Sequence, residues 1–185
     1  IGGGIGAGKS TIAALFGERG FSVLSADLVG HDVLADGSPL VADVAERWPE
    51  VVTDGSVDRS ALARIVFADS AELDALEAMT HPEIARRLRT AISSADWPVV
   101  VEVPVLGVLD GYDAVRIAVV AEPEIRIARA VARGGDPVDV RNRMARQPSD
   151  DEWSEWASLV IDSSRSWAET EHVAVAVIEE LVSHG

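Results

Sequence analysis

The residues with the clearest chemical role form a glycine-rich run that leads into the chain's single lysine. Lys9 is the one lysine among 16 basic residues, and all the others are arginines. The segment fits the pattern G-x-x-x-x-G-K-[ST] at each fixed position, and it reads Gly3-Gly4-Ile5-Gly6-Ala7-Gly8-Lys9-Ser10. Glycines let backbone N–H groups converge on anionic oxygens, and an ammonium on a flexible stem can reach the outer phosphates of a nucleotide. The segment therefore predicts a phosphate-binding loop.

Two further oxygen-bearing residues belong to the predicted chemistry. Ser10 places a hydroxyl where Mg²⁺ takes an oxygen ligand. Asp27 follows residues 21–25, a short apolar segment that predicts a buried parallel strand. Ligand crevices in open α/β sheets lie at the carboxyl ends of the strands, so we expect Asp27 to face a bound ligand. The structural alternative is that Asp27 caps the helix that follows, and the two roles can coexist.

The net charge of the chain limits which ligands and macromolecules it can bind. The formal net charge is −15, which argues against nucleic acid and means that a bound polyphosphate must be held by local cations. Arginines gather in two stretches: Arg126, Arg129, Arg133, Arg141, Arg143 and Arg146 in one, and Arg86, Arg87 and Arg89 in the other. Solvated helix faces are the alternative explanation of both clusters.

The elements that must position these residues follow an α/β pattern. We interpret Ile1 as the last residue of a first strand, and expect the native chain to begin several apolar residues earlier. Further strands are predicted at residues 21–25, 97–103, 115–120 and 159–162. Helices are predicted at residues 10–19, 123–134 and 173–182. In the middle helix we expect Ile125, Ile127, Ala128 and Val131 to face inward.

Residues 28–95 show helical patterning and no convincing strand. Predicted helices cover residues 38–48, 58–67, 70–79 and 82–93, with a turn at 54–56 and a break at His81-Pro82. This block is too long for a simple crossover between strands, so we expect a helical subdomain inserted beside the sheet. Residues 136–157 are predicted to form a mobile flap, with Asp139 capping one helix and Pro148-Ser149 starting another.

Composition limits the class of protein. The chain has no cysteine, so disulfides and thiolate metal sites are excluded, and its four histidines lack metal-ligand spacing. No run approaches the roughly 18 apolar residues of a transmembrane helix. We expect a cytoplasmic protein that contacts no membrane and is a monomer or a weak homo-oligomer.

From end to end the chain resembles the dephospho-CoA kinase family. The matching pieces include the loop through Thr11, Ala26-Asp27, Gly37-Ser38-Pro39, Asp58-Arg59-Ser60-Ala61-Leu62, Val66-Phe67-Ala68-Asp69, His81-Pro82-Glu83-Ile84, Pro104 with Leu106, Arg129 with Arg133, Arg143 with Gln147, and Ile161-Asp162. The resemblance implies a P-loop NTPase fold: three α/β/α layers around a parallel sheet, an inserted helical substrate domain and a helical lid. It divides the chain into a nucleotide-binding core (1–33, 96–135 and 158–185), a CoA subdomain (34–95) and a lid (136–157).

The resemblance also implies a reaction and its residues. An ATP-dependent kinase of this family moves the γ-phosphoryl group to the ribose 3′-hydroxyl of dephospho-CoA, with Mg²⁺ as cofactor. Asp27, Lys9 and Arg133 are the implied catalytic residues, and Ser10 the implied metal ligand. The implied nucleotide-binding residues are Gly4, Gly6, Ala7, Gly8, Lys9, Ser10, Thr11 and Arg143. The implied substrate-binding residues are Asp27, His81, Pro104 and Leu106.

The sequence departs from the family pattern at several positions. Ser25, Val108 and Ser158 stand where the family has acidic residues, His31 replaces a basic residue, and Ser163 replaces an asparagine. Loss of a carboxylate near the substrate would alter specificity or slow turnover, and Glu102 is close enough in sequence to compensate in part.

Two other functions remain open from the sequence. One is a kinase for a nucleoside or sugar alcohol on the same scaffold. The other is a catalytically weak nucleotide-binding regulatory protein, which the lost acidic positions favour and the intact Lys9, Ser10 and Asp27 disfavour.

Overall fold

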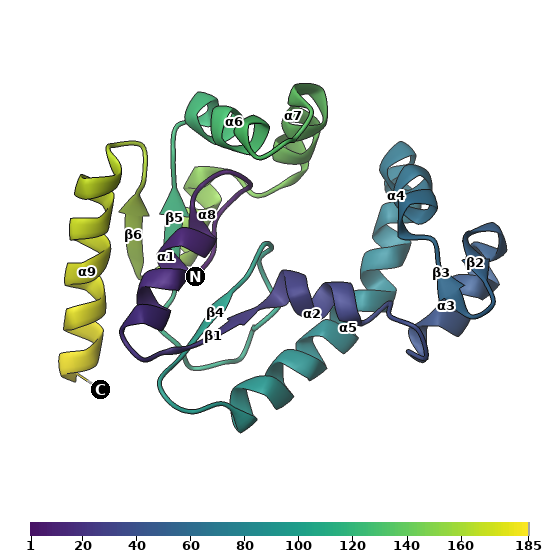
Figure 1. Ribbon diagram of the computed structural model, residues 1–185, viewed down its shortest axis with the longest axis horizontal. Helices are drawn as coiled ribbons and strands as arrows, with labels where there is room; N and C mark the ends of the chain where they lie inside the picture. The colour runs from purple at the N-terminus through teal and green to yellow at the C-terminus, as the bar shows by residue number, and fades with distance from the viewer. Residues whose placement is uncertain (185) are drawn as a thin grey trace. The chain divides into compact units, whose positions relative to one another are not determined.

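The computed structural model describes residues 1–184, which divide into two compact units (Figure 1). One unit comprises residues 1–25 together with the chain from residue 95 onward, and the other comprises Ala26–Ser94. The predicted CoA subdomain (34–95) and lid (136–157) divide the chain more finely than these two units, and their boundaries stay predictions.

The first unit is built on parallel strands. β1 (Ser22–Ser25) pairs with β4 (Val99–Glu102), and β5 (Ile117–Val120) pairs with β6 (Leu159–Asp162), in parallel in both cases. Apolar β-branched residues fill most of these strands, as their burial within a covered sheet requires.

Ile1 and Gly2 join the two pairs of strands. The Ile1 amine donates to the Val101 carbonyl at 2.7 Å, and the Val103 amide donates to the Ile1 carbonyl at 2.9 Å. On the other side, Gly2 forms a parallel bridge with Ala118. Ile1, where a first strand was predicted to end, therefore lies with Gly2 between β4 and β5, and the order of backbone segments is β1, β4, Ile1–Gly2, β5, β6.

Five helices belong to the described residues of this unit. They are α1 (Lys9–Glu18), α6 (Pro123–Ala132), α7 (Pro137–Arg146), α8 (Asp150–Trp156) and α9 (Trp167–His184). Figure 1 shows α9 beside β6.

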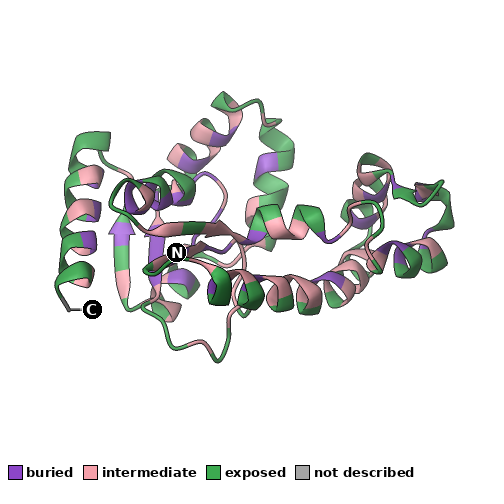
Figure 2. Cartoon of the chain, turned by 60° about the horizontal axis from the view of Figure 1, so that its bottom comes forward, coloured by how far each residue is buried: buried purple, intermediate pink, exposed green. Residues whose placement is uncertain are grey.

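Helices cover both faces of the sheet. Successive residues of a strand point to opposite faces. Ile1 packs in the buried cluster that contains Phe16 of α1 and Ile178 of α9, whereas a Cβ on Gly2 would lie 2.2 Å from the ring of Trp153 in α8. Figure 2 shows the buried positions of α9 along one side of the helix. The predicted three-layer α/β/α fold is confirmed.

The second unit is helical and has a core of its own. Its elements are α2 (Ala26–Asp32), α3 (Leu40–Arg47), the 3₁₀ helix η1 (Pro49–Val51), β2 (Val52–Thr53), β3 (Ser56–Val57), α4 (Arg59–Ala68) and α5 (Ser70–Ser94). Val44, Trp48 and Val66 are among the residues buried together there. As predicted, Asp58 caps a helix, and its carboxylate accepts from the amides of Ser60 and Ala61.

Two predictions about this unit were wrong. The break at His81-Pro82 does not occur, because α5 continues through Pro82 from Ser70 to Ser94. The segment expected to lack strands contains the short antiparallel hairpin of β2 and β3, which turns at Asp54-Gly55 with positive φ at both residues.

Three predictions about the first unit also need correction. The buried residues of α6 are Arg126 and Ala130, rather than the apolar set expected to face inward. The helix after Gly135 is capped by Asp136, not by Asp139. β1 is only partly buried because it lies at the edge of the sheet, where it pairs with β4 alone among the described strands.

Candidate active site

The phosphate-binding loop leaves the sheet at Gly2 and ends where α1 begins at Lys9. Gly3 has φ +147°, and a Cβ there would lie 2.2 Å from the Val119 carbonyl oxygen. Gly6 has φ +78°, and a Cβ there would lie 2.2 Å from the carbonyl oxygen of Arg126. Both positions therefore require glycine for backbone shape and for space.

Lys9 is buried and lies along its own loop. Its Nζ donates to the carbonyl of Gly4 at 3.3 Å, and 9% of the residue is exposed. The first amides of α1 and the positive end of the helix lie at the same place, which is the arrangement that attracts a phosphate group.

Ser10 and Glu102 form an oxygen pair beside the loop. The Ser10 Oγ donates to Glu102 Oε1 at 2.8 Å, and Glu102 is the last residue of β4, with 8% of its surface exposed. A hydroxyl and a buried carboxylate are the kind of oxygen donors that Mg²⁺ takes, so the residues present fit this cation. Among the described residues no cluster of three or more His, Asp or Glu side chains forms a site of its own for a metal ion.

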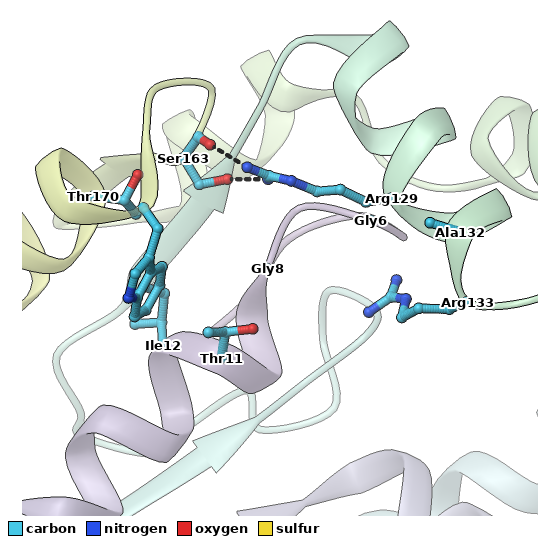
Figure 3. A pocket seen from close by; sticks show the side chains of 10 residues that line it. Gly6, Gly8, Thr11, Ile12, Arg129, Ala132, Arg133, Ser163 and Thr170 are labelled. Carbon is cyan, nitrogen blue, oxygen red and sulfur yellow. Dashed lines mark hydrogen bonds between the residues drawn. The ribbon is translucent and has the colours of Figure 1, made fainter.

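A pocket of about 390 Å³ opens next to the loop (Figure 3). Its lining comes from the loop, from α1, from α6 and its C-cap, from α9, and from the residue after β6: Gly6, Gly8, Thr11, Ile12, Arg129, Ala132, Arg133, Ser163, Trp167 and Thr170. The Arg133 side chain reaches from the end of α6 toward Thr11 (Figure 3). The pocket thus combines two guanidinium groups, hydroxyls and an aromatic ring next to a phosphate-binding loop.

Arg129 and Ser163 support the back of the loop. Arg129 donates through Nη1 to Ser163 Oγ at 2.8 Å and through Nη2 to the Ser163 carbonyl at 2.7 Å (Figure 3). The Ser163 hydroxyl donates in turn to the Ala7 carbonyl at 2.6 Å, and Ser163 is 3% exposed. The serine that replaces the family's asparagine therefore carries a hydrogen bond from α6 to the loop.

The other predicted cation lies elsewhere. Arg143 is in the last turn of α7, on an exposed position, and is not among the residues that line this pocket in the described chain. In the second unit, Arg86 and Arg87 both donate to Glu83 at 2.7 Å. These ion pairs within one helix agree with the alternative explanation, in which this arginine cluster forms a solvated helix face and does not bind phosphate.

The predicted substrate residues fall in both units. Asp27 lies in the first turn of α2, inside the helix rather than at a capping position, and His81 lies within α5 instead of at a turn. Pro104 and Leu106 lie in the loop that follows β4. This loop begins at the carboxyl end of its strand, and the phosphate-binding loop also leaves the sheet at that end.

Sequence reasoning missed three residues that contact the loop. Ser163 follows β6 directly, and its place at the carboxyl end of a strand was an available signal. Arg126 was grouped with the arginines that could act as local cations, with a solvated helix face as the alternative, whereas the structure buries it within α6. Gln147 accepts a hydrogen bond from the Ile5 amide, a contact across 142 residues of sequence that no local pattern reveals.

The chain is similar to known proteins over most of its length. The sequence model of the family described as dephospho-CoA kinase matches residues 1–169. A dephospho-CoA kinase of Deinococcus radiodurans is 41% identical over 171 residues, which cover 88% of this chain and 81% of that protein. One of Streptomyces avermitilis is 39% identical over 189 residues, covering 97% and 91%.

Two solved structures share the architecture. A crystal structure of a Thermus thermophilus protein superposes with a TM-score of 0.81 at 35% identity, covering 98% of this chain and 95% of that one. A dephospho-CoA kinase of Campylobacter jejuni gives a TM-score of 0.67 at 21% identity, covering 97% and 94%, and so supports the fold alone.

Proposed function

The chain belongs to the dephospho-CoA kinase family, and from that premise we propose how its own residues perform the reaction. The enzyme transfers the γ-phosphoryl group of ATP to the ribose 3′-hydroxyl of dephospho-CoA, the last step of coenzyme A biosynthesis. The main support for the residue roles is the intact glycine loop that follows Ile1–Gly2, with Lys9 and Ser10 at the start of α1.

Lys9 and the amides of Gly6, Ala7, Gly8, Ser10 and Thr11 hold the β- and γ-phosphates. The loop glycines, Gly4 included, keep side chains away from these oxygens. The long hydrogen bond from Lys9 to the Gly4 carbonyl gives way to charge-assisted bonds with phosphate, which are shorter and stronger. Phosphoryl transfer asks little covalent chemistry of a protein, so positioning and charge neutralisation dominate.

Ser10 is the proposed Mg²⁺ ligand, and Glu102 is the carboxylate beside it. The 2.8 Å hydrogen bond between them supports this proposal, because it aims the Ser10 hydroxyl and a buried anion at the same space. When bound, Mg²⁺ neutralises charge on the phosphate oxygens. Glu102 also supplies an acidic group near the loop in a chain that lacks the family's acidic residue at Val108.

Asp27 is the proposed base for the acceptor hydroxyl. A carboxylate of ordinary pKa is a weak base for an alcohol, but the proton leaves late in a loose transition state, so orientation of the hydroxyl is the larger contribution. Asp27 is the second residue after β1, close to the carboxyl end of a parallel strand, and this place supports the role.

Arg133 and Arg143 are the proposed cations of the nucleotide site. Arg133 lines the pocket next to Thr11, and a planar guanidinium suits phosphate oxygens. Arg143 belongs to α7, and Gln147, which caps the C-terminus of this helix, contacts the loop through Ile5. The pocket itself takes the nucleoside part of ATP, with Trp167 as an aromatic surface for the base.

The acceptor dephospho-CoA also needs binding residues. His81, Pro104 and Leu106 contact dephospho-CoA in this proposal, and the helical block 34–95 provides most of its binding surface. Residues 136–157 act as the lid, and the remaining chain forms the nucleotide-binding core.

The cellular setting is part of the proposal. None of the helices described in the structure combines the length and hydrophobicity that crossing a membrane requires. We place the enzyme in the cytoplasm as a monomer or weak homo-oligomer, and expect no nucleic-acid partner at a net charge of −15.

An acceptor comparison tests this function. ADP release is measured with dephospho-CoA, with a panel of nucleosides and sugar alcohols, and with no acceptor. Turnover should require dephospho-CoA. Equal turnover with a nucleoside would assign another acceptor, and ATP binding without turnover on any acceptor would indicate a regulatory protein.

A further inference from the structure

The peptide groups of Ile5, at the tip of the phosphate-binding loop, are held on both sides. The Ile5 N–H donates to Gln147 Oε1 at 2.7 Å, and the Ile5 carbonyl accepts from Arg126 Nε at 3.0 Å. One contact comes from the residue that ends α7, and the other comes from the buried side of α6. Both backbone groups of a loop residue are therefore satisfied by side chains far away in sequence.

Arg126 is a buried charge with a second partner. Only 4% of the residue is exposed, and its Nη1 donates to Asp150 Oδ1 at 2.8 Å. A buried guanidinium is costly unless it is paired and hydrogen-bonded, so Asp150 fixes where Arg126 lies. The loop accommodates the guanidinium closely, since a Cβ on Gly4 would lie 1.9 Å from Arg126 Nη2.

Gln147 and Asp150 lie three residues apart, in the segment predicted to form the lid. Gln147 ends α7 and Asp150 begins α8, whose Trp153 is fully buried against Gly2. The connection between α7 and α8 is therefore attached to the loop through Gln147 and through Arg126, while α8 itself is anchored in the layer beneath the sheet.

We propose that Arg126, Asp150 and Gln147 form a clamp whose task is to position the phosphate-binding loop for ATP. The clamp touches neither the phosphates nor the acceptor, so its members are positioning residues. By fixing the Ile5 peptide, it keeps the following amides, from Gly6 onward, converging on one point before nucleotide arrives. The inference rests on the proposed role of this loop in holding the phosphates of ATP.

Asp150→Asn tests the clamp, with Asp151→Asn as its matched control. Both changes remove one negative charge from the first turn of α8 and keep side-chain shape, but Asp151 is exposed and makes no ion pair with Arg126 among the described residues. Steady-state kinetics are measured for ATP and for dephospho-CoA separately, together with the thermal unfolding midpoint. Loss of a charge-assisted hydrogen bond should raise KM for ATP about tenfold in Asp150→Asn. KM for dephospho-CoA should change little, and Asp151→Asn should match the unaltered enzyme.

Gln147→Met provides the second test, because it removes the acceptor for the Ile5 amide at similar length without stranding a charge. Gln147→Met should also raise KM for ATP and leave KM for dephospho-CoA unchanged. Its thermal unfolding midpoint should stay close to that of the unaltered enzyme. The clamp is overturned if Asp150→Asn equals Asp151→Asn. It is also overturned if the variants lower the unfolding midpoint and kcat while KM for ATP stays constant, which is a purely structural effect. A failure of the proposed function is separate: the unaltered enzyme would then show no turnover with dephospho-CoA.

Discussion

In the proposed mechanism, Lys9 changes its hydrogen-bond partner when ATP binds. In the structure it donates to the Gly4 carbonyl at 3.3 Å, which is near the long limit for a hydrogen bond, and it lies buried where the phosphates of ATP would bring negative charge. The charge-assisted hydrogen bond that we propose between Lys9 and phosphate is stronger than this bond to a carbonyl.

Replacement of Lys9 by alanine should remove this stabilisation and leave the fold intact. We expect kcat/KM for ATP to fall roughly 10²–10³-fold, the range found when a preorganised charge-stabilising donor is lost. The thermal unfolding midpoint should stay close to that of the unaltered enzyme, because the loop keeps its glycines. Turnover at the original rate would remove Lys9 from the mechanism.

Asp27→Asn separates catalysis from binding at the acceptor. The amide keeps the shape of the side chain but neither accepts a proton nor carries charge, so kcat should fall by about 10²-fold or more. The dissociation constant for ATP, measured by calorimetry, should change much less. A parallel loss of ATP affinity and kcat would instead assign Asp27 a structural role in α2.

At the scale of elements, α5 continues through a proline, Pro82. Pro82 cannot donate to the preceding turn, and such a residue commonly ends or kinks a helix. Here Glu83 accepts from Arg86 and from Arg87, at i+3 and i+4, so the turn after Pro82 is stabilised locally. The Arg86 and Arg87 guanidiniums lower the pKa of Glu83 from its usual 4.5 to about 2.

This shift gives a pH-dependent prediction. A carboxyl group whose pKa is lower in the folded state stabilises the fold above pH 4.5, and the contribution is lost as pH falls toward 2. Unfolding by urea should show the unaltered protein more stable than Glu83→Gln at pH 7, with the difference shrinking below pH 4.5. Asp74→Asn, on an exposed position of the same helix, is the control. A difference that is constant down to pH 2 would contradict the pairing.

The same helix shows where sequence patterns stop being informative. The glycine loop and the cap at Asp58 follow from local chemistry and were predicted from the sequence. The continuation through Pro82 was not, since packing of α5 against neighbouring helices overrides the preference of one residue.

The buried face of α6 was missed for a related reason. A pattern of apolar residues predicted Ile125 and Ile127 inward, but Arg126 is buried because the loop carbonyl of Ile5 and the carboxylate of Asp150 satisfy its charge. Both partners lie far away in sequence, and a buried charge with distant partners has no local signature.

At the scale of the whole molecule, the negative net charge of the protein disfavours the approach of ATP. A protein with net charge −15 repels the ATP anion at long range, whereas Lys9 and the pocket arginines attract it only nearby. Salt shortens the Debye length from about 30 Å at 0.01 M to about 8 Å at 0.15 M, so it screens the distant repulsion more than the buried contacts.

We therefore expect kcat/KM for ATP to rise across this range of salt, opposite to the usual behaviour of phosphate-binding sites. The value of kcat at saturating ATP and dephospho-CoA serves as the reference and should vary little. A steady decrease of kcat/KM with added salt would show that the local cations dominate even the approach of ATP.

Identification of the product tests the central claim most directly. The purified protein is incubated with dephospho-CoA, ATP and Mg²⁺, and the new phosphate is located by phosphorus NMR and mass spectrometry. The account predicts one phosphomonoester on the ribose 3′-oxygen for each ADP formed. ADP accompanied only by inorganic phosphate, or a phosphate at another position of the acceptor, would contradict it.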